Sequence, residues 1–268
     1  MALRRLSRAA FLVMLMSPVL RNWLNDLLAA AAFLTRLPVP RGDAPPDLPH
    51  AYRAFPLVGA VIGAAIGAVD LLLLRIGLPA IAAAALALGA GALLTGALHD
   101  DGLADVADGF GGGSDKAAKL EVMRDSRLGT YGVLVLLTAF VAKVGALAAL
   151  PRADVIVALL ATHALARAPL AVLAATMPYA REGLAASVGR PDPSTAFATV
   201  VVAAAIAFLA LPAGIAMTAI IVAAAGATCF AVLAQRQIGG QTGDVLGAAE
   251  QVCEVAVLLT LAARFAQP

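Results

Sequence analysis

The sequence predicts an all-α, polytopic integral membrane protein with about seven transmembrane helices. Of its 268 residues, 62% are hydrophobic and only 13% are charged, whereas soluble domains carry about 25% charged residues. This composition leaves too little polar surface to cover a globule in water. The apolar residues also form segments of about 20 residues, the length that a helix needs to cross a bilayer. Because lipid offers no hydrogen-bond partners to the backbone, these segments are expected to be helices.

The predicted spans follow one another from residue 55 onward. They are Phe55–Leu74, Leu78–Leu98, Tyr131–Leu150, Val155–Met177, Ala196–Leu211, Ile215–Ala234 and Val245–Ala263. Pro212 and Gly214 are expected to separate the fifth span from the sixth, because proline cannot continue a helix and glycine permits a turn. Small residues, as in GAVIGAAIGA, favour close helix packing in lipid; biased base composition is the alternative explanation for them.

The first 50 residues form a separate region. Arg4, Arg5 and Arg8 before an apolar run look like the start of a signal peptide, but cleavage there would export a segment whose charges favour the cytoplasm. We therefore interpret residues 1–20 as an N-terminal extension and residues 21–268 as one membrane-embedded catalytic domain. The stretch 21–40 is amphipathic at its start and too short to span, which predicts an interfacial or re-entrant helix.

The distribution of basic residues predicts the orientation. With the N-terminus in the cytoplasm, most lysines and arginines fall in cytoplasmic loops, and the opposite loops carry only Arg75, Arg152 and Arg264. This places the loops at 99–130 and 235–244 in the cytoplasm.

The net charge of only +2 gives no sign of a nucleic-acid partner. Cys229 and Cys253 lie in apolar runs without disulfide or zinc spacing, so we expect them to be core residues.

Residues 99–113, HDDGLADVADGFGGG, concentrate negative charge at the end of the second predicted span. Asp101, Asp105 and Asp108 recur at i, i+4 and i+7, which puts them on one face of a helix. Like charges so close destabilise a helix unless a cation binds, and oxygen ligands favour Mg²⁺, with Mn²⁺ possible. The predicted metal ligands are Asp100, Asp101, Asp105 and Asp108, Asp100 being off the shared face and assigned to a second ion. A solvated acidic helix end is the alternative.

Neighbouring residues in this loop predict phosphate binding. Gly109, Gly111 and Gly112 would let a phosphate approach the backbone closely. Further on, in LEVMRDSRLGTYG, Arg124 and Arg127 have the planar fork that grips phosphate, although arginines at a membrane edge also bind anionic lipid. His99 is interpreted as a metal ligand or as a histidine in an ordinary hydrogen bond.

Ionisable residues inside the spans form a second group. Lys143, Arg167 and Glu254 lie roughly 13 to 18 Å from the cytoplasmic ends of their helices, at about 1.5 Å per residue. Such residues are costly in lipid and are commonly functional, so we expect them to meet in one pocket open to the cytoplasm. A purely structural ion pair is the alternative.

The last stretch of interest is GGQTGDVLGAAEQVCE, residues 239–254. Asp244 is predicted to be the N-cap of the final helix, whose N-terminus also attracts anions. At the helical period, Asp244 and Gln251 share a face that Glu254 flanks. A second acidic site facing the first aspartates is therefore expected.

Five motifs in this order resemble the cobalamin synthase family, whose members are adenosylcobinamide-GDP ribazoletransferases, also called cobalamin 5′-phosphate synthases. The motifs are FLTRLPVP, FPLVGAVIG, HDDGLADVADGFGGG, MRDSRLGTYG and GGQTGDVLGA, and the resemblance covers Leu24 to Ala263. It implies an enzyme of the bacterial inner membrane that joins adenosylcobinamide-GDP to α-ribazole or its 5′-phosphate, releases GMP and needs Mg²⁺. An alcohol or phosphate oxygen of the ribazole would attack the cobinamide-linked phosphorus, while the aspartates hold the metal.

The resemblance also implies roles for individual residues. Asp101, Asp105 and Asp108 match the family's acidic motif. The implied catalytic residues are Lys143, Arg167, Asp244 and Glu254, and the implied substrate-binding residues include Asp125, Ser126, Arg127 and Thr242. Ala166 and Gln251 depart from the family pattern, and neither belongs to the aspartate group.

Three other classes of protein share some of these features. The aspartate spacing resembles that of CDP-alcohol phosphotransferases, but their motif has Ala-Arg where this chain has Phe110-Gly111. UbiA-type prenyltransferases need a second aspartate-rich loop, and the Thr-Gly-Asp motif at 242–244 has too few aspartates to be one. A cation-coupled transporter would use Lys143, Arg167 and Glu254, but the inverted repeats common in transporters are not evident.

Overall fold

A computed structural model describes residues 17–40 and 47–265, and this part of the chain is helical with one isolated bridge between Tyr179 and Gln241. Its helices are α2 (Pro18–Leu34), α3 (Leu48–Ala51), η1 (Tyr52–Ala54), α4 (Phe55–Arg75), α5 (Ala80–Thr95), α6 (Leu98–Gly112), α7 (Lys116–Val122), α8 (Thr130–Ala149), α9 (Val155–Thr176), α10 (Leu184–Val188), α11 (Pro193–Ala210), α12 (Ala213–Ile238) and α13 (Gly243–Phe265). The predicted all-α class is confirmed. The signal-like residues 4–8 lie outside the described ranges.

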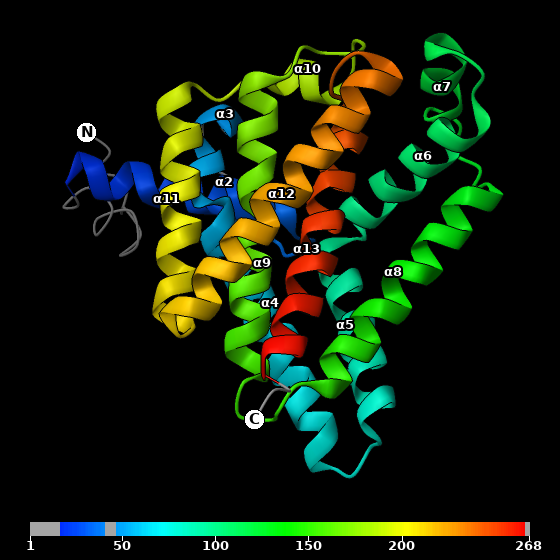
Figure 1. The fold of residues 1–268 in the computed structure, drawn as a ribbon. Coiled ribbons are helices and arrows are strands. Elements are labelled where there is room, and N and C mark those ends of the chain that lie inside the picture. Colours follow the sequence, from blue (N-terminus) through cyan, green and yellow to red (C-terminus); the bar gives the residue numbers. More distant parts are fainter. Residues whose placement is uncertain (1–16, 41–46, 266–268) are drawn as a thin grey trace, which may run out of the picture.

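Six helices of the described residues are long and apolar enough to cross a membrane, and a bent pair raises the number to seven if it counts as one span. These six confirm six of the predicted spans, and Pro212 does start a new helix as the N-cap of α12. Figure 1 shows α7, α10 and the turn between α12 and α13 at the same end of the molecule. The loops that were predicted to share one side of the membrane therefore do lie together.

The remaining predicted span, Leu78–Leu98, is not one straight helix. After α5 the chain turns by 93° into α6. Gly96 (φ 70°) and Ala97 (φ 55°) both adopt the left-handed conformation, which ends the helical hydrogen-bonding pattern. The backbone N–H of Arg36 also donates to the carbonyl of Leu94 at 2.8 Å, so the segment after α2 is fixed to this bend. The bend points the aspartates of α6 sideways, across the bundle.

Two glycines bring α6 against the start of α13. A Cβ atom at Gly102 would lie 2.8 Å from the carbonyl oxygen of Asp244, and one at Gly247 would lie 3.3 Å from the Cα of His99. Any side chain at Gly102 would therefore push the two helices apart. This contact joins two motifs that are far apart in the sequence.

Helices α9 and α13 form the centre of the bundle. In the apolar 18-residue stretch of each of these two helices, 72% of the residues are buried inside the bundle, against 22% to 39% in the other spans. Gly59 and Gly63 of α4 pack directly on the backbone of α9, since a Cβ at Gly59 would lie 2.5 Å from the carbonyl oxygen of His163. The glycines of GAVIGAAIGA thus serve close packing, in agreement with the first of the two explanations considered for them.

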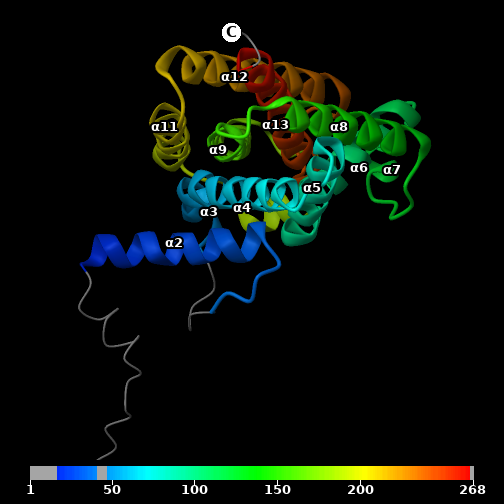
Figure 2. The same cartoon turned by 90° about the horizontal axis from the view of Figure 1, so that it is seen from below.

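Helix α2 lies across the direction of the spans. Figure 2 shows it along its length on the outer side of α4, while α11 is seen end-on. Asp26 accepts from Arg53 Nε at 2.6 Å and lies 3.3 Å from His50 Nδ1, and the Arg53 guanidinium stacks over Trp23 at 4.3 Å. These contacts hold α2 against α3 and η1. A short helix of this orientation agrees with the predicted interfacial helix.

Candidate functional site

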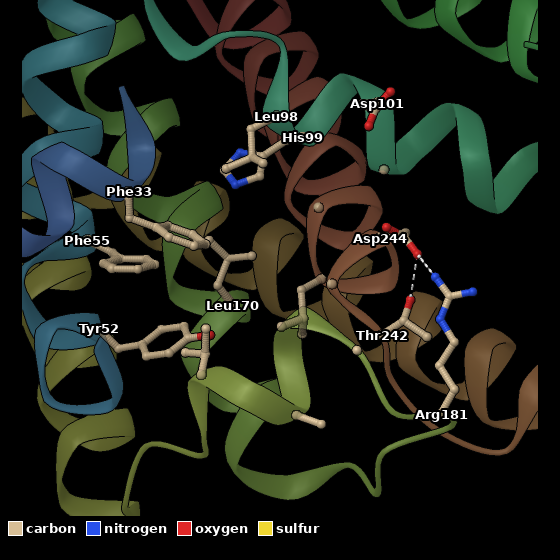
Figure 3. A pocket seen from close by; sticks show the side chains of 17 residues that line it. Phe33, Tyr52, Phe55, Leu98, His99, Asp101, Leu170, Arg181, Thr242 and Asp244 are labelled. Carbon is tan, nitrogen blue, oxygen red and sulfur yellow. Dashed lines mark hydrogen bonds and ion pairs between the residues drawn. The ribbon is translucent and has the colours of Figure 1, made fainter. Parts of the chain in front are cut away.

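A cavity of about 270 Å³ lies where α2, η1, α6, α9 and the start of α13 meet. Asp101, Arg181, Thr242 and Asp244 line one end, and Phe33, Tyr52, Phe55 and Leu170 line the other (Figure 3). The cavity therefore has a charged end and an aromatic end. Asp101, Thr242 and Asp244 were predicted as site residues, whereas the aromatic side chains were not.

Arg181 organises the charged end of the cavity. Its Nη2 donates to Asp244 Oδ2 at 2.8 Å, and its Nη1 donates to the carbonyl of Leu120 at 2.7 Å. The segment before Arg181 is fixed by Gln241, whose backbone exchanges hydrogen bonds with Pro178 and Ala180 at 2.8 and 2.9 Å. The sequence showed Arg181 only as one of many loop cations. Because 63 residues separate it from Asp244, no local spacing pattern relates the two.

The helix cap predicted at Asp244 is instead formed by Thr242. The backbone N–H of Val245 donates to Thr242 Oγ1 at 3.2 Å, which is the N-cap geometry. Thr242 Oγ1 also donates to Asp244 Oδ2 at 3.1 Å. Asp244 therefore lies in the first turn of α13, where its carboxylate is free to face the cavity and Arg181.

The acidic cluster, defined as Asp101, Asp105 and Asp244, collects three carboxylates from α6 and α13. Asp101 and Asp244 line the cavity, and Asp105 is close enough to both for their charges to interact. Arg181 balances only one of these charges. Three oxygen donors with an excess of negative charge fit Mg²⁺, which binds a few carboxylates and completes its shell with phosphate oxygens and water. Of the expected second acidic site, only Asp244 faces the aspartates of α6, because Gln251 and Glu254 contact Lys143 instead.

Asp108 has a different environment from the one predicted. Its two carboxylate oxygens accept the backbone N–H groups of Gly129, at 2.7 Å, and of Gly132, at 2.9 Å. These are N–H groups at the start of α8, which has no other partner for them within the helix. We therefore assign Asp108 to capping α8 and not to a metal. Asp108 lies on the same helix as Asp101 and Asp105, as predicted, but its hydrogen-bond donors come from the start of α8.

Asp100 also turns away from the acidic cluster. Its Oδ1 lies 3.7 Å from Lys143 Nζ, inside the bundle. The positive charge next to Asp100 is therefore the ammonium group of Lys143, where the sequence predicted a second metal ion. Asp100 belongs to the buried network described below.

The glycines predicted to bind phosphate have other roles or none. A Cβ at Gly109 would overlap the side chain of Met123 and the carbonyl of Lys119 on α7, and one at Gly111 would lie 2.6 Å from the ring of Tyr131. Both glycines are thus explained by helix packing. Gly112 has open space around it, and none of the three lines the cavity.

The DSR turn, Asp125 to Arg127, lies outside the cavity. Arg127 Nε donates to both oxygens of Asp125 at 3.0 Å, and its side chain is 87% exposed. These hydrogen bonds lower the pKa of Asp125 to about 2. Ser126 and Arg124 are exposed as well. The structure does not bring this predicted substrate-binding turn together with the acidic cluster.

Lys143, Arg167 and Glu254 do meet, as predicted. Lys143 Nζ donates to Glu254 Oε1 at 3.1 Å and to Gln251 Oε1 at 2.8 Å, and Arg167 Nη1 donates to Glu254 Oε2 at 3.3 Å. All four side chains are buried. A small cavity of about 50 Å³ lies beside them. Because each cation already has a carboxylate partner, the geometry favours the structural reading over the phosphate-binding one.

Further side chains complete this buried network. Arg167 Nη1 also contacts Glu250 and donates to His163 Nδ1 at 2.8 Å, and His99 Nδ1 lies 3.1 Å from Glu250 Oε2. His99 thus makes an ordinary polar contact, which was one of its two interpretations. Among the described residues, His163, Glu250 and Glu254 are the one group of three whose ligand atoms all lie within 4.8 Å of one another, whereas those of the acidic cluster are more widely spaced. The Arg167 guanidinium already contacts all three, so the positive charge there is supplied by the protein.

Comparison with known proteins agrees with the resemblance. A family model described as cobalamin-5-phosphate synthase matches residues 26–262. A protein of Bradyrhizobium diazoefficiens named adenosylcobinamide-GDP ribazoletransferase is 44% identical over 248 residues, which are 91% of this chain and 95% of that protein. Proteins of the same name from Azorhizobium caulinodans, 42% identical over 88% of this chain and 94% of theirs, and Sinorhizobium medicae, 44% identical over 91% and 98%, are also similar.

No solved structure matches the chain. The family model spans every helix from α3 to α12, together with about half of α2 and most of α13. It therefore includes the acidic cluster, the buried network and both ends of the cavity. On the strength of these matches, the chain belongs to the cobalamin-5-phosphate synthase family.

Proposed function

We propose that this chain is a Mg²⁺-dependent adenosylcobinamide-GDP ribazoletransferase of the bacterial inner membrane. The observation that carries the proposal is the acidic cluster of Asp101, Asp105 and Asp244 at one end of a cavity, in a chain of this family. The relatives' name gives the two substrates. The carboxylates supply the metal ligands that transfer of a diphosphate-linked group needs.

The reaction is a displacement at phosphorus. A ribose hydroxyl of the ribazole attacks the phosphorus that is linked to cobinamide, the new P–O bond forms, and the P–O bond to GMP breaks. The hydroxyl loses its proton to solvent or to a nearby carboxylate, and GMP leaves with the bonding electrons. A hydroxyl is the common nucleophile because α-ribazole and its 5′-phosphate both have one.

The acidic cluster would hold Mg²⁺ through Asp101, Asp105 and Asp244. When bound, the metal supplies positive charge to the diphosphate and to the leaving phosphate. Arg181 orients Asp244 through the 2.8 Å hydrogen bond and leaves the carboxylates of α6 free. Asp108 holds the start of α8 beside them.

The buried network would position the site and not take part in the chemistry. Asp100 and His99 of α6 pair with Lys143 of α8 and Glu250 of α13. The network therefore fixes the rotation of α6, and with it the direction in which Asp101 and Asp105 point. Lys143, Arg167 and Glu254 are positioning residues in this proposal.

The acidic cluster would face the cytoplasm, where guanosine nucleotides are present. Basic residues dominate the loops at the same end as α7 and α10, and such residues favour the cytoplasmic side. The large, partly apolar corrinoid would approach along the lipid edge. Both substrates would then reach the cavity without crossing the membrane.

The test is turnover in membranes that contain the protein. Adenosylcobinamide-GDP, Mg²⁺ and either α-ribazole or its 5′-phosphate are added, and mass spectrometry follows GMP together with cobalamin or its 5′-phosphate. Membranes without the protein should form neither product. Membranes treated with EDTA should also form neither product, and excess Mg²⁺ should restore product formation in them. Absence of product with both acceptors would overturn the proposal.

A further inference from the structure

The aromatic end of the cavity gathers side chains from three separate elements. Phe33 of α2, Tyr52 of η1 and Phe55 of α4 stack in a row, with ring centroids 5.7 Å apart for Phe33–Phe55 and 4.6 Å apart for Tyr52–Phe55. Aromatic residues make up only 5% of the chain, so three of them around one cavity are a marked concentration. The acidic cluster does not explain them, since carboxylates need no aromatic neighbours.

The position of Phe33 relates this group to the cavity. Phe55 and Tyr52 are buried behind it, 1% and 6% exposed, whereas Phe33 is only partly buried. Figure 3 shows the ring of Phe33 pointing into the cavity, next to Leu170 of α9. The two side chains give the cavity an apolar lining at the end remote from Asp244.

The chemistry of this surface selects one part of the substrates. A corrin ring with its side chains is far larger than a cavity of about 270 Å³. Guanine has a polar edge that would lose its hydrogen bonds among Phe33, Phe55 and Leu170. The base of ribazole is a benzimidazole with two methyl groups, which is planar, apolar and small. Stacking on aromatic side chains is the usual way in which proteins bind such rings.

We propose that Phe33, Tyr52, Phe55 and Leu170 form the binding site for the planar base of the ribazole acceptor. This inference rests on the proposed function and adds to it the place of one substrate. With its base at this end, the ribose of the acceptor extends toward Asp101 and Asp244, where the hydroxyl meets the phosphorus. Helix α2 then contributes to acceptor recognition as well as lying across the bundle.

The first test is Phe33→Ala, with Phe197→Ala as the matched control. Phe197 lies on α11, is 71% exposed and lines no cavity described above. Loss of one base–aromatic stacking contact should raise the KM for the ribazole roughly 10-fold. The KM for adenosylcobinamide-GDP and the kcat should stay within about twofold, as should all constants of Phe197→Ala. An unchanged ribazole KM in folded Phe33→Ala, or a rise only in the KM for adenosylcobinamide-GDP, would overturn the proposal.

The second test needs no large truncation. Free 5,6-dimethylbenzimidazole should inhibit the wild-type enzyme competitively against ribazole and not against adenosylcobinamide-GDP. In Phe33→Leu, which keeps the volume but loses the ring, its inhibition constant should rise about fivefold or more. Inhibition that competes with adenosylcobinamide-GDP, or that is equal in Phe33→Leu, would place the base elsewhere. Failure of the proposed function is a separate outcome, since the wild-type enzyme would then form no product at all.

Discussion

At the scale of single residues, the aspartates of α6 differ in role although they share one motif. Asp101 and Asp105 belong to the acidic cluster, Asp108 caps α8, and Asp100 pairs with Lys143. The helical period predicted which residues share a face. It did not predict the partners, because the backbone of Gly129 and the side chain of Lys143 arrive only through the packing of α8.

Asp101→Asn should therefore reduce mainly turnover, and Asp108→Ala should reduce mainly stability. Asp101→Asn removes charge from the proposed metal site, so turnover should fall at least 100-fold while the melting temperature in detergent changes little. Asp108→Ala leaves two N–H groups of α8 without acceptors, which costs about 1 to 3 kcal/mol of stability. Its turnover per folded molecule should fall less than that of Asp101→Asn. Near-normal turnover of Asp101→Asn at limiting Mg²⁺ would remove Asp101 from the metal site.

Lys143→Met tests whether the buried network is structural. The substitution leaves Glu254 and Asp100 without this partner, and breaking a buried ion pair costs about 3 to 5 kcal/mol. We expect an early thermal transition in detergent, with unchanged KM values for the surviving folded fraction. The double variant Lys143→Met with Glu254→Gln should recover part of the lost stability. A stable Lys143→Met with a raised KM for a phosphate-containing substrate would instead show contact with that substrate.

At the scale of helices, the site depends on how α6 meets α13. Apolar segment lengths predicted seven spans, and six of them are single helices in the structure, because bilayer thickness sets the length of a span. The 93° bend between α5 and α6 was missed, since Leu98 continues the apolar run and only Gly96 and Ala97 interrupt the helix. Arg181 was missed as a site residue for a related reason. Its contact with Asp244 exists only after distant segments pack, and a single sequence carries no pattern for it.

Gly102→Ala should reduce activity by separating these two helices. The added methyl would lie 2.8 Å from the Asp244 carbonyl, so α6 must shift and carry Asp101 away from Asp244. We expect at least a 10-fold loss of kcat/KM, because displacements of about 1 Å can cost 100-fold. Gly89→Ala on α5 is the matched control, because a methyl group there meets no atom within 4 Å. Equal activity of the two variants would show that the close contact is unnecessary.

At the scale of the whole molecule, the ends of the bundle differ. Helices α7 and α10 and the turn before α13 lie at one end (Figure 1), and basic residues favour the cytoplasm for their loops. Composition alone thus predicted which loops lie on a common side. Composition could not predict the cavity between α2 and α13, because the aromatic residues at 33, 52 and 55 show no local pattern of a binding site.

A cysteine at the exposed Ser114 tests the orientation. In a Cys229→Ser background, which removes the exposed native thiol, Ser114→Cys should react with a membrane-impermeant maleimide in inverted vesicles and remain unlabelled in intact spheroplasts. Arg152→Cys, in the loop between α8 and α9, is the control and should give the reverse pattern. Labelling of Ser114→Cys from outside would reverse the orientation of the bundle.

The buried network also constrains the order in which the chain is made and inserted. Lys143 leaves the ribosome with α8, after its partner Asp100 on α6, whereas Arg167 leaves with α9 and its carboxylate partners Glu250 and Glu254 follow only with the last helix. Until α13 arrives, Arg167 has no carboxylate partner and would cost about 2.5 to 3.5 kcal/mol at the centre of a lipid-facing helix. During synthesis α9 is therefore expected to remain in the protected environment of the insertion machinery. Release into the bilayer would then wait for the C-terminal helix, and a nascent chain that stops before residue 243 should be a substrate for membrane proteases.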